Sequence, residues 1–267
     1  MITFTNSAVL ITGAFGPTGQ FSGFNLLASD VSISTQNNRR GTKRLGSPGF
    51  YSQVMEGPAA GSLSLTYYMT DTDADVRNLL TGMVEPGTGI QLFDVHVGKY
   101  RCYSGVVNSL TMSIDPYAPV SCSLDISFYN GYDQLGDFRT LNTPGDVIHG
   151  GVSQVDTTLL WGSDLAGCEY SMSQDIAPVY ALGELTPSGY TREGGSLEVA
   201  LDGTGLGHIL DFSGICSGYT TGNITLTGLC EGTVGGSIPF SGYVTNPSIT
   251  VAPNSEINGS LTIFDVF

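Results

Sequence analysis

Two stretches of the chain carry the residue types that a nucleotide-binding site would need. Residues 9–19 (Val-Leu-Ile-Thr-Gly-Ala-Phe-Gly-Pro-Thr-Gly) form an apolar run followed by three evenly spaced glycines. Glycines at this spacing let a backbone approach a pyrophosphate at the start of a helix. Arg39 and Arg40 follow at a distance from which they could bind a 2′-phosphate. The chemistry would be hydride transfer with NADP.

The first stretch resembles the opening of the short-chain dehydrogenases, whose catalysis uses a Tyr four residues before a Lys. The only lysines here are Lys43 and Lys99, and neither follows a Tyr at that spacing. Residues 21–29 also lack the capped helical stripe that should follow the glycines. We therefore interpret residues 9–19 as a β-strand that ends in a Gly-Pro loop, and we expect no catalytic residues and no cofactor.

The remaining reactive side chains form no recognisable catalytic or metal-binding motif. His96 lies two residues from Asp94, so both could share a strand face, but HxxxH, HExxH and Gly-x-Ser-x-Gly patterns are missing from the sequence. The five cysteines are odd in number and lack the CxxC spacing of a metal site. We expect free thiols in a reducing compartment and no bound metal.

The charge of the chain argues against nucleic-acid binding by attraction. The net charge is −15, whereas phosphate binding needs Lys and Arg. An acidic surface would instead let nucleic acid move past without adhering. The basic residues Arg39, Arg40, Lys43 and Arg44 crowd into one loop between expected strands. This loop is either a solvated turn or a docking loop that reaches an acidic neighbour.

Alternating apolar and polar residues predict an all-β fold. The expected strands are residues 62–69, 103–114, 120–128, 223–229, 243–251 and 257–264. Two short helices are also expected, over residues 71–82 and 206–214. No segment approaches the apolar length of a membrane span, so we expect no membrane association.

An internal repeat is the most informative feature of the sequence. Tyr-Ser-Gly-Val-Val at residues 103–107 matches Phe-Ser-Gly-Tyr-Val at 240–244, a displacement of 137 positions, and apolar positions continue to agree to the end of both copies. Weaker matches pair residues 61–65 with 195–199, 45–46 with 182–183, and 32–34 with 171–173. We predict two tandem β-sandwich or barrel domains, at residues 1–132 and 152–267, joined by a linker at 133–151, each with one short helix.

The order of elements resembles the major tail, or tail tube, proteins of long-tailed bacteriophages. The resemblance rests on the Gly-x-x-x-Gly-Ser-Leu-Ser-Leu-Thr-Tyr-Tyr strand that ends at Tyr68, the extended loop before it and the closing hairpin at 103–129. It implies sheets paired edge to edge in stacked rings, a lumen through which DNA passes, and a loop (Arg39, Arg40, Lys43 and Arg44) that docks on a neighbouring subunit. Its partners would be further copies of the chain and other tail proteins, in a virion assembled in the host bacterial cytoplasm.

Such tubes commonly have six domains per ring, so a duplicated chain predicts trimers with pseudo-six-fold symmetry. Alternatives remain. A baseplate, tail-tip or neck protein would reuse the same domain. A carbohydrate-binding adhesin would suit the acidity and the aromatics. An NADP-dependent short-chain dehydrogenase is the least favoured.

Overall fold

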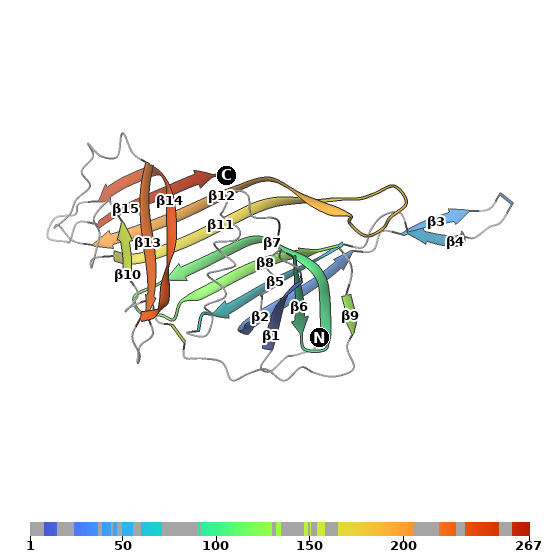
Figure 1. Ribbon diagram of the computed structural model, residues 1–267, viewed down its shortest axis with the longest axis horizontal. Coiled ribbons are helices and arrows are strands. Elements are labelled where there is room, and N and C mark those ends of the chain that lie inside the picture. The colour runs from blue at the N-terminus through green and yellow to red at the C-terminus, as the bar shows by residue number, and fades with distance from the viewer. Residues whose placement is uncertain are drawn as a thin grey trace.

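The computed structural model confirms the all-β prediction, since its secondary structure consists of antiparallel strands (Figure 1). The described residues are 8–14, 24–36, 39–43, 45–46, 50–55, 60–70, 90, 92–129, 132–134, 147–148, 150, 154–157, 165–204, 219–227, 233–250 and 258–267. None of these residues is in an α-helix. The two expected helices, at 71–82 and 206–214, lie outside the described residues.

The strands of the first half form a closed ring of pairings. Their order is β7–β6–β1–β2–β5–β8, and β8 pairs again with β7. The bounds are β1 Ala8–Ala14, β2 Phe24–Gln36, β5 Ala60–Tyr68, β6 Leu92–Val97, β7 Tyr100–Ile114 and β8 Ser121–Phe128. The long strands β2 and β7 each change neighbours along their length, which lets one sheet curl back on itself. A short two-stranded sheet, β3 (Arg39–Lys43) with β4 (Phe50–Met55), projects from this half (Figure 1).

The second half repeats the same order of pairing. Its strands run β11–β12–β15–β14–β13–β10, corresponding in turn to β2–β5–β8–β7–β6–β1. The bounds are β10 Gln154–Thr157, β11 Leu165–Val179, β12 Gly189–Thr204, β13 Tyr219–Thr227, β14 Thr233–Thr250 and β15 Asn258–Val266.

The hairpins β7–β8 and β14–β15 agree residue by residue. Val107 pairs with Ile126, and Val244 pairs with Ile263, each displaced by 137 positions. The same holds for three pairs beyond a register shift, which lies between Val107 and Ser109 in one hairpin and between Thr245 and Ser248 in the other. Those pairs are Thr111–Ser123, Met112–Cys122 and Ser113–Ser121, matched by Ser248–Ser260, Ile249–Gly259 and Thr250–Asn258. The repeat in the sequence is therefore also a repeat in backbone register.

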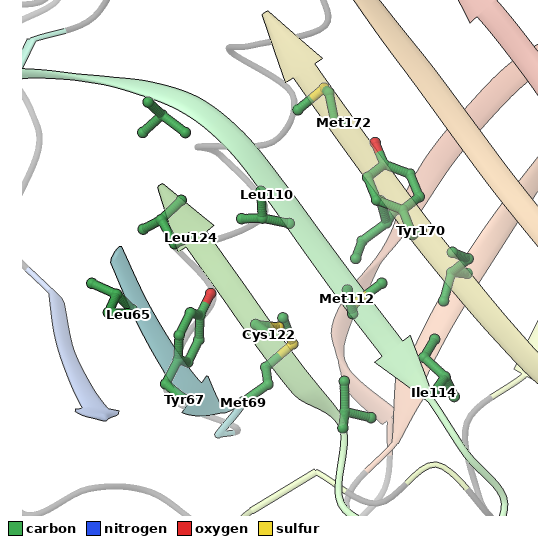
Figure 2. Packing of buried hydrophobic residues seen from close by; sticks show 14 of the residues in the cluster. Leu65, Tyr67, Met69, Leu110, Met112, Ile114, Cys122, Leu124, Tyr170 and Met172 are labelled. Atoms are coloured by element: carbon green, nitrogen blue, oxygen red, sulfur yellow. The ribbon is translucent and has the colours of Figure 1, made fainter. Parts of the chain in front are cut away.

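The two halves meet where β7 pairs with β11. Residues 109–114 of β7 pair antiparallel with residues 168–173 of β11, which makes a single 13-stranded sheet. Buried residues cross this join without interruption. Figure 2 shows Leu110 and Met112 of β7 beside Met172 and Tyr170 of β11, and each of the four is at most 1% exposed.

The segment expected to act as a linker contributes to the first half where it is described. Its residues 133 and 134 belong to β9 (Tyr132–Gln134), which pairs with the start of β7. Ile148 is buried, donates its backbone N–H to the carbonyl of Met69 and accepts a bond from the N–H of Val120. These contacts tie the end of the segment to β5 and β8.

Two repeat-related glycines allow strands to approach closely. A Cβ on Gly105 would lie 2.7 Å from Cγ2 of Ile126, and a Cβ on Gly242 would lie 2.7 Å from the carbonyl oxygen of Phe264. Both positions therefore exclude a side chain, which explains why the Ser-Gly pair recurs in the two copies.

We expect Gly242→Ala to lower the free energy of unfolding by about 1–3 kcal/mol, since the added methyl meets backbone that has no room to shift. Gly189→Ala is the matched control, because nothing lies within 4 Å of its Cβ position. That variant should stay within about 0.5 kcal/mol of the parent in urea unfolding. Equal stability of the two variants would contradict this reading.

Candidate assembly surfaces

The predicted basic loop forms part of the projecting hairpin. Arg39, Arg40 and Lys43 lie on β3, and the side chain of Arg40 is exposed. Arg44 lies outside the described residues. The hairpin thus brings three of the four predicted basic residues onto one five-residue strand, away from the large sheet (Figure 1).

A second projecting hairpin matches the first at its tip. Leu45, next to β3, is fully exposed and precedes Gly46, whose φ is +85°. Leu182, between β11 and β12, is also fully exposed and precedes Gly183, whose φ is +88°. The left-handed φ requires Gly at both turns. The repeat therefore retains an exposed Leu at both hairpin tips. An apolar side chain in water at these positions does not stabilise the fold.

The large sheet carries a polar face opposite its core, which we call the hydroxyl face. It comprises the side chains that alternate with buried residues on β2, β5, β8, β7, β11, β12, β15 and the end of β14. Hydroxyl pairs bridge its strands, at 2.7 Å between the Oγ atoms of Ser34 and Ser62 and 2.8 Å between those of Ser173 and Ser196. These two pairs are equivalent in the repeat.

The hydroxyl face is also acidic. Six exposed carboxylates lie on it, namely Asp30, Asp125, Glu169, Asp175, Glu198 and Asp202. The described stretches of these strands that carry the hydroxyl pairs and carboxylates (residues 30–34, 62–66, 109–113, 121–127, 169–175, 194–202 and 258–262) contain no Lys or Arg, and Arg101 and Arg192 lie further along β7 and β12. A broad surface of hydroxyls and carboxylates repels phosphates and offers them no cationic partner.

A charged cluster that sequence reasoning missed supports the bend in β7. Arg101 donates from Nη2 to Oδ2 of Asp94 at 2.5 Å, and the N–H of Ser104 donates to Oδ1 of Asp94 at 3.1 Å. Ser104 has a φ of +53°, so the carboxylate holds a strained turn. The hydrogen bond to Asp94 raises the pKa of Arg101.

The cluster continues to β9 at the same corner. Tyr103 donates its hydroxyl to Asp133 at 2.7 Å, a bond that raises the pKa of Tyr103. The Arg101 guanidinium lies 4.5 Å from the Tyr103 ring centroid. We interpret the cluster as a structural brace. The sequence signal for this cluster is the two-residue turn at Gly98-Lys99, because a turn of that length places Asp94 near Arg101.

The other reactive groups belong to the core or to strand pairing. His96 is buried on β6, opposite Arg101. Cys102, Cys122 and Cys168 are buried free thiols, and burial raises the pKa of Cys102 to about 11 and that of Cys168 to about 12. In the part of the chain that the structure describes, no group of three or more His, Cys, Asp or Glu side chains could hold a metal.

The strand that leads into the Gly-rich stretch lies in the wrong kind of sheet for a dinucleotide site. β1 pairs antiparallel with both β2 and β6, whereas the dinucleotide fold places this strand in a parallel sheet. Residues 15–23, which hold the second and third glycines, lie outside the described residues.

No protein-family model matches the chain, and no curated protein matches it significantly. Over the described ranges, no helix is long and apolar enough to cross a membrane.

Proposed function

We propose that this chain is a structural subunit of a bacteriophage tail tube, a hollow conduit for DNA. The two halves would be tandem tube domains, each with one short helix, and three chains would form a ring with pseudo-six-fold symmetry. Rings would stack into a tube within the virion tail, and the protein would act without catalysis or a cofactor.

The observation that carries the proposal is the join between the two repeats. Because β7 pairs with β11, two β units with the same strand order already share one sheet within a single chain. A ring of such units requires that same side-by-side pairing between domains. The hydroxyl face then runs across both units without a break.

The charges of this face fit passage of DNA. Its six carboxylates would repel the phosphates of a passing duplex, and its neutral hydroxyls would leave no strong attachment point. The basic hairpin lies apart from this face and is suited to an acidic copy of the same chain, whose net charge is −15.

Negative-stain electron microscopy, with light scattering for mass, tests the proposal on the purified chain. We expect hollow rings or tubes with three chains per ring. A monomer at every concentration and salt would overturn the tube. Rings of six chains would overturn the pseudo-six-fold arrangement, because each chain would then supply a single position in the ring.

A further inference from the structure

The internal join shows how two of these units pair. On one edge of β7, β6 ends its pairing at Gly105, and β11 takes over from Ser109 to Ile114. The strand of the second half that corresponds to β7 is β14. There β13 ends its pairing at Tyr243, and the edge beyond it, to Thr250, pairs with no described strand.

The strand that corresponds to β11 is β2, and one edge of it also has no partner among the described strands. β2 pairs with β5 along residues 28–36, and β1 pairs with it only at residues 24–27. The edge of β2 away from β5 has no described partner beyond residue 27. In the repeat, Ser32 and Ile33 of β2 correspond to Ser171 and Met172 of β11, because Ile33 pairs with Leu63 as Met172 pairs with Leu197.

Burial also differs between the internal join and these two edges. Met172 in the internal join is 0% exposed. Val107, just before the join, is 2% exposed, and its carbonyl accepts a hydrogen bond from Gln174 of β11. Their counterparts Ile33 and Val244 are only partly buried, although both pack against the core. Open edges that expose apolar residues favour pairing with another strand.

We propose that β2 of one copy pairs antiparallel with β14 of a second copy, in the register of the internal β7–β11 join. Ser171 lies opposite Thr111 in that join, with their hydroxyl oxygens 3.4 Å apart. The equivalent residues place Ser32 opposite Ser248 and Asp30 opposite Thr250. The contact joins two different edges, so each copy has one of each to offer. A contact of this kind forms a ring when the rotation from one copy to the next closes.

Closure of these contacts into a ring rests on the proposed function. The register of the β2–β14 pairing follows from the repeat alone. The occupant of both edges is a second copy of this chain. The hydroxyl face would continue across the contact, since Ser32 and Ser248 both lie on it.

A disulfide tests the register directly. In the full chain, Ser32→Cys combined with Ser248→Cys should cross-link copies under mild oxidation, because facing residues of paired strands have Cβ atoms about 4.5–5.5 Å apart. Non-reducing electrophoresis should show dimers and larger species that disappear on reduction, and peptide mass spectrometry of mixed ¹⁴N and ¹⁵N protein should show the 32–248 link between copies.

The matched control is Ser64→Cys with Ser248→Cys. Ser64 pairs with Ser32 on the same exposed face, one strand further from the edge. A second strand spacing of about 4.8 Å puts it beyond disulfide reach, so we expect at least about tenfold less cross-linking. Each single variant controls for the native thiols. Equal cross-linking of the two double variants would overturn the register.

Hydrogen exchange on the unmodified chain tests the same pairing without relying on a variant that must fold. Residues 29–34 and 246–250 should gain amide protection in assembled protein relative to dilute monomer. If rings or tubes form without this protection and without the 32–248 link, the β2–β14 pairing is wrong and the proposed tube function still stands. The link without rings or tubes would support the pairing and count against the tube.

Discussion

Tyr170→Ala should lower the free energy of unfolding by about 3–5 kcal/mol, the range for truncating a large buried aromatic side chain. Tyr170 is 1% exposed and lies on β11, with Met112 of β7 on one side and Val199 of β12 on the other. Its ring therefore fills the core at the join of the two halves (Figure 2). Burial also raises the pKa of its hydroxyl, as expected for a phenol shielded from water.

Urea unfolding followed by far-ultraviolet circular dichroism measures this loss. Tyr117→Ala is the control, since Tyr117 is 93% exposed in a turn, and we expect it to change stability by less than about 0.5 kcal/mol. Because the core crosses the join, both halves should unfold in one transition. A loss below about 1 kcal/mol for Tyr170→Ala would mean that the join is not packed as described.

Neutralising the basic hairpin should abolish assembly without unfolding the chain. Replacing Arg39, Arg40, Lys43 and Arg44 with Gln removes four positive charges and takes the net charge from −15 to −19. The remaining surface is acidic, so copies would lose their main cationic contact and repel one another. We expect the mass of sedimented rings or tubes to fall by more than about tenfold at low salt.

A variant with the same change in net charge separates the hairpin from charge in general. Arg77, Lys99, Arg139 and Arg192 lie outside the hairpin, and their replacement with Gln also gives −19. That variant should still assemble, whereas the parent should lose assembly as salt rises, because salt screens exposed charges. If both variants assembled like the parent, the hairpin would be a solvated turn.

Part of the site could be read from the sequence, and part could not. The basic cluster was visible because four cations fall within six residues of an otherwise acidic chain. The Asp94–Arg101 brace was missed because its residues meet only when β6 and β7 pair across the turn. The hydroxyl face was not predicted either, since its members become neighbours only through strand register.

The sequence by itself determined the all-β class and the core-facing positions, because alternation along a strand is a local property of the chain. It also determined the repeat. The paired residues of the two closing hairpins keep the same displacement of 137 positions before and after the register shift. The tertiary structure decided that β7 pairs with β11 and that β7 closes on β8. Strand edges present the same backbone N–H and C=O groups whatever the side chains, so the choice of neighbour depends on which edges the whole fold leaves open.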